Sequence, residues 1–434
     1  MADDRGGRAV GGRGLYAKRL NGWLDIASLV LIAPAVVGGV YWGVVLYHVL
    51  RTRWLLPTAR AGMRLAEAGA LRRAGAPRLC VVIPAHNEAG SIGPLAESLR
   101  EQTYGNLRVV FALDRCTDDT AGVLLRIVGD DGRFEIMRID SCPGDWAGKV
   151  NAVWRGVRES VGARGGGAAA ELLLFIDADT AMHPECLVAT VALLQNRGLG
   201  MLSLLSTMTH DRWFEKVVQP AAGMELMRQY PLLRANMDAG RRAFANGQFI
   251  LMTAEAYGRI GGHEAARGAL LEDVEIARLC ERHGVPAGVL LADGMHLCRM
   301  YGSYAEFVRG WKRIYVECAN RRISRLRKLA RRTRWLGAVV PALMWAGLGV
   351  GVFGMLRVGE GMSVVLLYAA GVSLGLMLLT LGASYRMGHT PLRHVLSYPV
   401  GAWLTGGILE RAARDLESRE PTVWAGREYV REAR

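Results

Sequence analysis

The sequence predicts an α/β fold with a largely parallel central sheet, with transmembrane helices on its N- and C-terminal sides. Short apolar runs alternate with helix-like segments between positions 79 and 300, as in sheets whose parallel strands are joined by helices. Apolar stretches long enough to cross a bilayer lie on both sides of this region. In total, 51% of the 434 residues are hydrophobic, which exceeds the usual range of soluble proteins.

Charge and cysteine content narrow the class of protein. The net charge is +14, and the Lys and Arg residues cluster beside the apolar stretches, which favours positive-inside membrane anchoring over nucleic-acid binding. The 7 cysteines have no paired or metal-like spacing, so they indicate reduced cytosolic thiols rather than disulfides or a zinc site. We therefore expect a membrane and no nucleic acid as partner.

The N-terminal part contains one expected span. Residues 1–23 are rich in Gly and Arg and are predicted to be disordered. Residues 24–50 are predicted to form a transmembrane helix, and 51–78 a basic juxtamembrane linker on the cytosolic side. Basic residues also precede the span, so charge leaves the orientation of the N-terminus open.

The α/β domain, 79–300, opens with alternating strands and helices. The expected strands are Leu79–Pro84, Leu107–Leu113, Arg133–Ile139 and Leu172–Ile176, and the expected helices are Glu88–Gln102, Thr117–Val128 and Lys149–Val161. The first and last of these strands are unbroken apolar runs, which is typical of strands buried on both faces of a sheet.

The central strand runs directly into Asp177-Ala178-Asp179. Alternate residues of a strand point to the same side, and open α/β sheets bind ligands at the carboxyl ends of their strands. Two carboxylates there suit Mg²⁺ or Mn²⁺ that carries substrate phosphates. A surface turn with two solvated acids is the alternative, and the buried strand in front favours the metal site.

The part after the α/β domain returns to the membrane. Residues 301–334 are basic and amphipathic, which indicates helices on an anionic membrane surface; an RNA-binding arm is the rival. Residues 335–356 and 362–385 are predicted transmembrane helices. Residues 392–409 are expected to form a re-entrant, interfacial or fourth transmembrane segment, because charged residues and a proline interrupt them. Residues 410–434 are expected to be a basic cytosolic tail.

Short motifs follow one another in a fixed order along the α/β domain and just beyond it. They are VVIPAHNE (81–88), LDRCTDDT (113–120), DWAGKVNAVWRG (145–156), DAD (177–179), FANGQFIL (244–251), GGHEAARGALLEDVEIA (261–277) and RMYGS…RGW (299–311). In this order they resemble the family-2 glycosyltransferases, closest to the membrane-anchored branch that includes hopene-associated and carotenoid glycosyltransferases. The resemblance implies a GT-A-type, Rossmann-like domain that binds a nucleotide sugar.

The resemblance implies a donor site with a divalent metal. Its donor-binding residues are Pro84, Ala85, Asn87, Glu88, Asp114, Lys149, Asp177 and Ala178, and its metal ligands are Asp179 and Asp177, for Mg²⁺ or Mn²⁺. The family commonly has Asp-Asp where this chain has Leu113-Asp114, so the base contact depends on Asp114 alone. The role of Arg115 stays open between a pocket contact and a solvated side chain. Lys149 at a helix start suits a phosphate or an acidic neighbour, with a surface lysine as the alternative.

The resemblance also implies a general base. Asp273 would take the proton of the acceptor hydroxyl while its oxygen attacks the anomeric carbon, which predicts inversion. Helix capping is the alternative for this acid. The expected acceptor-binding or closing residues are Gly247, Gln248, Glu272, His263, Arg299 and Trp311. A structural histidine in a turn is an equal alternative for His263.

A departure from the sequence pattern of the processive family members indicates how many sugars are transferred. Processive synthases carry Gln-x-x-Arg-Trp, whereas Phe307 and Gly310 occupy the Gln and Arg positions here, before Trp311. We therefore expect a multi-pass enzyme of the inner (cytoplasmic) membrane that transfers one hexose, from a UDP-sugar, to a lipid hydroxyl at the cytosolic face. A carotenoid, a hopanoid and a glycerolipid are all compatible acceptors. A processive polysaccharide synthase and a non-catalytic membrane scaffold are the alternatives.

Overall fold

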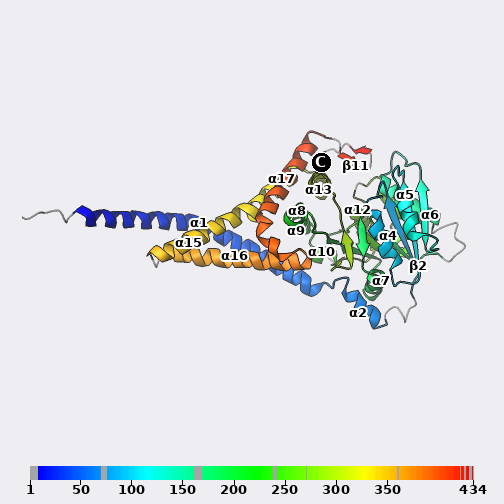
Figure 1. Ribbon diagram of the computed structural model, residues 1–434, viewed down its shortest axis with the longest axis horizontal. Helices are drawn as coiled ribbons and strands as arrows, with labels where there is room; N and C mark the ends of the chain where they lie inside the picture. The colour runs from blue at the N-terminus through cyan, green and yellow to red at the C-terminus, as the bar shows by residue number, and fades with distance from the viewer. Residues whose placement is uncertain are drawn as a thin grey trace, which may run out of the picture.

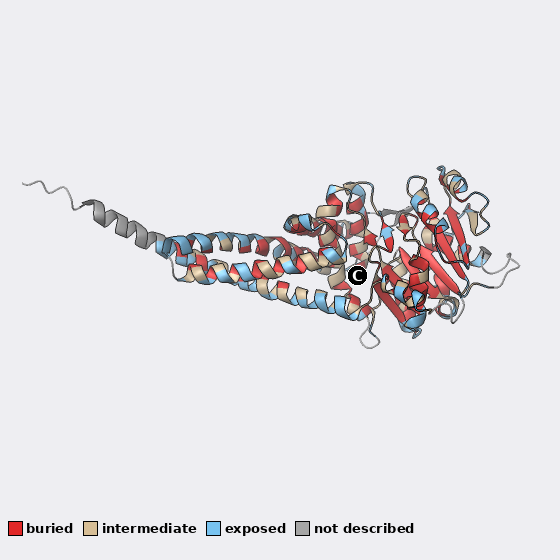
Figure 2. Cartoon of the chain, turned by 60° about the horizontal axis from the view of Figure 1, so that its bottom comes forward, coloured by how far each residue is buried: buried red, intermediate tan, exposed pale blue. Residues whose placement is uncertain are grey.

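The computed structural model describes residues 8–69, 76–160, 169–237, 242–269, 271–358, 361–420, 422–424, 427–429 and 433. Along its longest axis the molecule has a bundle of long helices, then a group of shorter helices, then an α/β domain (Figure 1). The strands of the α/β domain are buried, whereas the long helices expose many of their side chains (Figure 2).

The α/β domain is built on a seven-stranded sheet with the order β3-β2-β1-β4-β8-β6-β9. Its strands are β1 (Leu79–Ala85), β2 (Leu107–Asp114), β3 (Phe134–Ile139), β4 (Leu172–Ile176), β6 (Met201–Leu205), β8 (Phe249–Thr253) and β9 (Ala287–Leu291). Only β8, among these strands, runs antiparallel to its neighbours. A second sheet joins β5 (Thr180–Met182), β10 (His296–Cys298) and β7 (Thr207–Met208). The largely parallel sheet predicted from the sequence is confirmed.

Helices cover both faces of the large sheet. One face packs against α4 (Ile92–Arg100), α5 (Thr120–Val128) and α7 (Cys186–Asn196). The other packs against α6 (Gly148–Ser160), α11 (Ala254–Arg259), the 3₁₀ helix η1 (Gly262–Ala266) and α12 (Glu272–Arg282). Within β1, Val81 and Ile83 face the first group, whereas Cys80 and Val82 face the second. This alternation explains why the strand reads as an unbroken apolar run.

The first two helices are shorter than predicted. Helix α4 begins at Ile92 rather than Glu88, and α5 at Thr120 rather than Thr117. The loops before them bind each other instead: Thr120 Oγ1 accepts a hydrogen bond from the Glu88 N–H (2.9 Å), and Asn87 Oδ1 accepts one from the Thr117 N–H (2.7 Å). These loop contacts replace the first helical turns.

The helical bundle consists of α1 (Arg8–Leu55), α15 (Val340–Val358) and α16 (Met362–Met387). In the described part of the chain, three helical stretches are long and apolar enough to cross a membrane, namely Asn21–Leu55, Ile323–Val358 and Met362–Met387. The second includes α14 (Ile323–Arg334) and a short π-helix, Trp335–Val339, before α15. Since α1 begins at Arg8, the prediction of disorder is wrong for residues 8–23, and residues 1–7 lie outside the described part of the chain.

The segment predicted as a linker, 51–78, contains folded structure. Helix α1 continues to Leu55, and α2 (Ala61–Glu67) packs against α7. A side chain at Gly62 would overlap the backbone of Ala189, so the two helices touch at close range. The juxtamembrane chain is thus attached to the α/β domain.

Shorter helices fill the space between the bundle and the α/β domain. They are α8 (Trp213–Val217), α9 (Gln219–Gln229), α10 (Leu232–Ala235), α13 (Tyr304–Cys318), the 3₁₀ helix η3 (Leu392–Ser397) and α17 (Tyr398–Glu417). The predicted amphipathic helices of 301–334 are present as α13 and α14, but their apolar faces are buried in the protein. Trp311, Tyr315 and Leu326 are 6%, 0% and 0% exposed, because α9 and α17 cover them. The prediction that this segment lies on the membrane surface is therefore wrong for its apolar face.

The segment 392–409 forms η3 and the first half of α17, and α17 is not among the three candidate spans. Its helix continues to Glu417, beyond the start of the predicted basic tail at 410. Farther on, β11 (Thr422–Trp424) and β12 (Arg427–Tyr429) pair as an antiparallel hairpin. The tail is therefore partly folded in the described residues.

Candidate active site

Residues far apart in the sequence meet at the carboxyl edge of β1, β2 and β4. Asp177 follows β4, and Lys149 lies in the first turn of α6, which leads from β3 toward β4. Because β8 is antiparallel, Gly247, which precedes it, lies at this same edge. Helix α12 runs back toward the start of β9, so its N-terminal residues Glu272 and Asp273 are there too. Open α/β sheets bind their ligands at this edge.

Lys149 holds two of the acids. Its Nζ lies 2.7 Å from Asp177 Oδ1 and also forms an ion pair with Glu272, while 27% of the lysine side chain is exposed. Burial alone would lower the pKa of Lys149, but the charges of Asp177 and Glu272 raise it. Burial likewise opposes ionisation of Glu272, yet Lys149 lowers the pKa of this acid. The lysine therefore remains a cation with acidic neighbours.

Asp273 is held by backbone groups rather than by a cation. Its Oδ2 accepts a hydrogen bond from the Gly247 N–H (2.9 Å), and its Oδ1 accepts one from the Val274 N–H (2.7 Å). Burial, and then the charge of Glu272, raises the pKa of Asp273 to about 6. A carboxylate with this pKa is ionised at neutral pH and is a stronger base than an ordinary aspartate.

Gly247 permits this close packing. A Cβ atom there would lie 3.1 Å from both Glu272 Oε1 and Lys149 Nζ, and 3.3 Å from Asp273 Oδ2. Larger residues would therefore press on three charged groups at once. Gln248, the next residue, is buried, and its Oε1 accepts a hydrogen bond from Asn246 Nδ2 (3.1 Å).

Asp179 is suited to bind a cation. Its Oδ1 is buried and has no hydrogen-bond partner in the described part of the chain. Burial, and then the charges of Asp177 and Glu88, raises the pKa of Asp179 to about 8. Burial also raises the pKa of Asp177, against the opposing charges of Lys149 and Arg313. A bound cation would relieve both effects, since it would add positive charge beside the two carboxylates.

The residues present fit a metal that shares its ligands with a substrate. No group of three or more His, Cys, Asp or Glu side chains among the described residues forms a closed metal site. Asp177 and Asp179 supply two carboxylates at one edge of the sheet. Magnesium is commonly held by one or two carboxylates together with substrate phosphates and waters.

The expected donor loop follows β1. Pro84 and Ala85 end the strand, and Asn87 has a left-handed backbone, with φ 57°, and an exposed side chain. Burial raises the pKa of Glu88, whose carboxylate accepts a hydrogen bond from Ser91. Ala178, between the two aspartates, is buried.

Asp114 has a partner that the sequence did not reveal. Arg115 Nη2 lies 2.6 Å from its Oδ2, and Arg115 Nε lies 2.9 Å from its Oδ1. The carboxylate is 3% exposed, and the pair packs against Gly148 at the start of α6. Arg115 is therefore paired with Asp114 and only partly exposed, and Asp114 offers a nucleotide base an already paired carboxylate.

Three further expected residues are engaged elsewhere. His263 is buried against Phe175, its Nδ1 lies 3.1 Å from the Tyr257 hydroxyl, and burial lowers its pKa to about 4; this fits the structural alternative. The Arg299 guanidinium pairs with Asp211 at 2.6 Å on the surface, although its backbone N–H donates to the Asp179 carbonyl (3.0 Å). Trp311 packs among the apolar side chains of α13, α14 and α17. Closing roles for Arg299 and Trp311 stay predictions.

Sequence reasoning missed Tyr301 and Arg313. Both interact electrostatically with the acids, Tyr301 with Asp179 and Arg313 with Asp177. Tyr301 lies inside the RMYGS motif, and Arg313 lies two positions after Trp311. Their places in or beside a recognised motif were the available signal.

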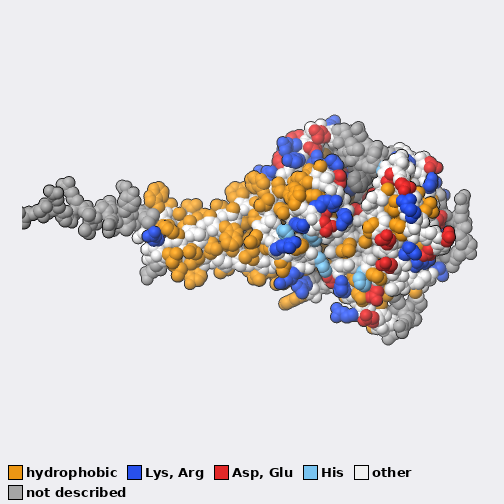
Figure 3. Space-filling view, viewed as in Figure 1, with side chains coloured by type: hydrophobic (Ala, Val, Ile, Leu, Met, Phe, Trp, Pro, Cys, Tyr) orange, Lys and Arg blue, Asp and Glu red, His pale blue; other side chains and the backbone are white. Residues whose placement is uncertain are grey.

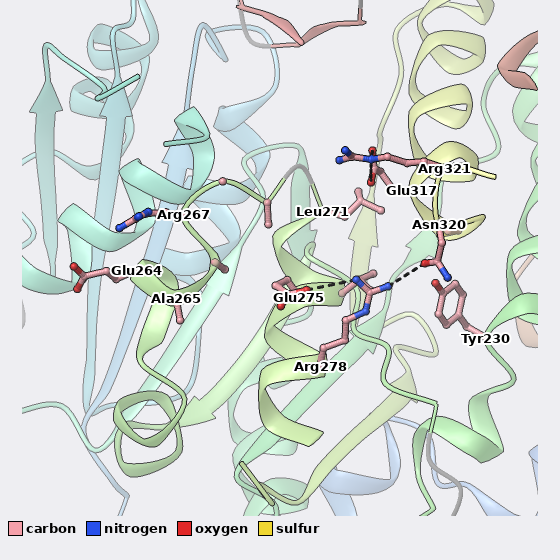
Figure 4. A pocket seen from close by; sticks show the side chains of 15 residues that line it. Tyr230, Glu264, Ala265, Arg267, Leu271, Glu275, Arg278, Glu317, Asn320 and Arg321 are labelled. Carbon is pink, nitrogen blue, oxygen red and sulfur yellow. Dashed lines mark hydrogen bonds and ion pairs between the residues drawn. The ribbon is translucent and has the colours of Figure 1, made fainter. Parts of the chain in front are cut away.

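A cavity of about 560 Å³ lies on another face of α12 (Figure 4). Leu271, Val274, Glu275 and Arg278 line it at helical spacing, whereas Asp273 points to the acidic cluster. Its polar side chains bind one another: Arg278 donates hydrogen bonds to Glu275 and Asn320, each at 3.4 Å. This cavity is distinct from the cluster around Lys149.

A family model described as "Glycosyltransferase like family 2" matches residues 77–320. A comparison with curated proteins found no similar sequence.

Several solved structures are similar to the chain at low identity. The mannosyltransferase PcManGT from Pyrobaculum calidifontis, in complex with GDP-Man and Mn²⁺, is 16% identical over 90% of this chain and 98% of its own, with a TM-score of 0.44. S. aureus TarS 1-349 with UDP-GlcNAc is 12% identical over 82% and 96%, with a TM-score of 0.38. Glucosyl-3-phosphoglycerate synthase from Mycobacterium tuberculosis, with Mn²⁺, UDP and glucosyl-3-phosphoglycerate, is 17% identical over 58% and 84%, with a TM-score of 0.38.

The family match includes every motif from VVIPAHNE to RMYGS…RGW, and the largely parallel sheet with acids at its carboxyl edge is a GT-A-like α/β fold. Because that match covers more than half of the chain, the protein belongs to the glycosyltransferase-like family 2.

Proposed function

We propose that the protein is a membrane-bound, inverting glycosyltransferase that moves a single hexose from a nucleotide-diphosphate sugar to a lipid hydroxyl. The observation that carries this proposal is the convergence of two kinds of carboxylate around Lys149. Asp177 and Asp179 lie where a metal-bound diphosphate can sit, and Asp273 lies across the same cluster, held as a base.

Each side chain has a role in this reaction. A Mg²⁺ or Mn²⁺ ion held by Asp177 and Asp179 would neutralise charge on the departing diphosphate. Lys149 keeps Asp177 and Glu272 in place and adds a positive charge near the phosphates. Asp273 accepts the proton of the acceptor hydroxyl as its oxygen attacks the anomeric carbon. A single displacement without an enzyme nucleophile inverts that carbon.

The lipid acceptor is supported by the surface of the molecule. Apolar side chains cover the helical bundle, and Lys and Arg gather where the bundle meets the α/β domain (Figure 3). Beside the bundle, Leu396, Val400 and Trp403 are 66%, 57% and 51% exposed. We call these three residues the interfacial strip. Val400 and Trp403 lie about one turn apart on α17, and Leu396 precedes them in η3, while the opposite face of α17 is buried. Such a strip suits the acyl boundary of a bilayer.

The finer identity of the substrates follows from the motif resemblance. That resemblance points to a UDP-sugar as donor and to the hopene-associated and carotenoid branch, with a glycerolipid as a further acceptor. The concentration of Lys and Arg after the first span favours the cytosolic face of the inner membrane.

The test is transfer by purified full-length protein in lipid vesicles. We expect UDP-hexose and Mn²⁺ or Mg²⁺ to give a lipid product that is one hexose heavier by mass spectrometry. A ladder of longer products would support the processive synthase instead. If no sugar nucleotide gives a product, the hypothesis of a non-catalytic membrane scaffold is favoured.

A further inference from the structure

The hydroxyl group of Tyr301 is buried and has no hydrogen-bond partner among the described residues. Nearly all buried polar groups in proteins are paired, because an unpaired one loses its hydrogen bonds to water without compensation. A buried tyrosine hydroxyl without a partner beside the acidic cluster is therefore a candidate for a hydrogen bond to a ligand.

The position of the Tyr301 ring is fixed by the helix beneath it. A side chain at Gly310 would overlap the hydroxyl end of this ring, so only glycine leaves room for it. The ring also meets Phe307 edge-on, with centroids 5.6 Å apart. Gly310 and Phe307 are the two positions at which this chain departs from the Gln-x-x-Arg-Trp pattern. Both departures thus serve to hold Tyr301.

Tyr301 interacts electrostatically with the proposed metal ligand Asp179. Burial raises the pKa of its hydroxyl, the charge of Arg313 opposes that rise, and the charge of Asp179 adds to it. The backbone ties the same groups together, because the Arg299 N–H bonds the Asp179 carbonyl two residues before Tyr301. Like the Tyr301 hydroxyl, Asp179 Oδ1 is buried and has no hydrogen-bond partner in the described part of the chain.

These two groups need opposite partners. The Asp179 oxygen requires a cation or a donor, whereas the Tyr301 hydroxyl can donate a proton to an oxygen. A divalent metal that carries a diphosphate offers both at once: the metal meets the carboxylate, and a phosphate oxygen accepts the tyrosine hydrogen bond. A lone metal would leave Tyr301 unsatisfied.

We propose that Tyr301 is a substrate-binding residue that donates a hydrogen bond to the diphosphate of the sugar donor, from a ring position for which Gly310 leaves room. This inference rests on the proposed function. An arginine at position 310 would occupy the space of the Tyr301 ring, so the two side chains exclude each other.

The test is calorimetric titration of UDP, with and without Mn²⁺, into the full-length protein in detergent. Y301F keeps the ring and removes only the donor. We expect it to weaken UDP binding about tenfold or more, which is the usual effect of losing a hydrogen bond to a charged group. Y304F is the matched control, because Tyr304 stacks on the same Phe307 ring with its side chain partly exposed, and it should bind within about twofold of wild type.

G310A is an independent second variant, because its methyl group must displace the Tyr301 hydroxyl, and it should weaken UDP binding like Y301F. Thermal melting confirms that each variant is folded. If folded Y301F binds UDP as tightly as Y304F does, the role of Tyr301 is wrong while the proposed function stands. If the wild-type protein binds neither UDP nor GDP, the donor class itself is wrong and both proposals fail.

Discussion

The backbone N–H of Gly247 donates a 2.9 Å hydrogen bond to Oδ2 of Asp273, joining the loop before β8 to the first turn of α12. Together with the bond from the Val274 N–H, it fixes both oxygens of the proposed base. Each oxygen keeps a lone pair for a proton. The base is therefore oriented before the acceptor arrives.

Replacing Asp273 by Asn should lower transfer by about 10²–10⁴-fold, the usual contribution of a general base. UDP binding, measured by calorimetry, should change little, because the donor ligands remain. The exposed Asp119, which pairs with Arg126 on α5, gives a matched control in D119N, which should transfer normally. Turnover of D273N within about tenfold of wild type would place the base elsewhere.

The pH dependence of transfer should report the same residue. The pKa of Asp273 is raised to about 6, and only its ionised form accepts a proton. Activity should therefore be full above this pKa and fall as the pH drops through about 6. A profile of kcat from acidic to neutral pH tests this, with UDP binding followed in parallel. A constant kcat across that range would contradict the assignment.

Removing the proposed metal ligands should abolish transfer without unfolding the protein. Asp179→Ala and Asp177→Asn should each reduce activity by at least about 10²-fold, since they remove charge stabilisation at the leaving diphosphate. Chelator should have the same effect on the wild type, reversed by added Mn²⁺. Full activity in excess chelator would rule out the metal role.

Replacing Lys149 by Met should affect stability as well as activity. Asp177 and Glu272, whose side chains are 27% and 11% exposed, would lose their shared cation. Breaking such a pair costs about 3–5 kcal/mol when it is fully buried. Because 27% of the lysine side chain is exposed, we expect about 3 kcal/mol or less, seen as a lower melting temperature. R126Q, which breaks an exposed pair, should cost at most about 1 kcal/mol. Equal melting temperatures for the two variants would show that the Lys149 cluster is not stabilising.

Membrane docking should depend on the interfacial strip. The arginines of α14 and the turn before it are partly engaged within the protein, since Arg321 pairs with Glu317 and Arg327 with Glu417. We expect L396D/V400D/W403D to lower transfer to vesicle lipid by roughly tenfold or more, because each apolar side chain withdrawn from lipid forfeits up to about 1.5–3 kcal/mol.

The matched control for the strip is L125D, since Leu125 is 56% exposed on α5 of the α/β domain. UDP binding should be unchanged in both variants. Normal transfer to vesicle lipid by the triple variant would show that the strip faces water.

The α/β fold, the order of its first strands and helices, and the candidate spans could all be predicted from the sequence. These depend on local patterns: apolar runs for buried strands, long apolar stretches for spans, and acids directly after a strand for the ligand edge. Asp177, Asp179 and Asp273 could be named because each follows or starts a recognisable element within a motif.

Which side chains form ion pairs and hydrogen bonds in the site depends on the tertiary fold and could not be predicted from the sequence. Lys149 forms ion pairs with Asp177 and Glu272 because α6 crosses over from β3 toward β4. Gly247 bonds Asp273 because β8 runs antiparallel to β4. The ion pair between Asp114 and Arg115 could likewise not be predicted from the sequence. The amphipathic pattern of α13 and α14 showed that one face is covered, but a period of 3.6 residues cannot distinguish lipid from another helix. In this protein α17 covers that face, because its apolar side packs against both helices.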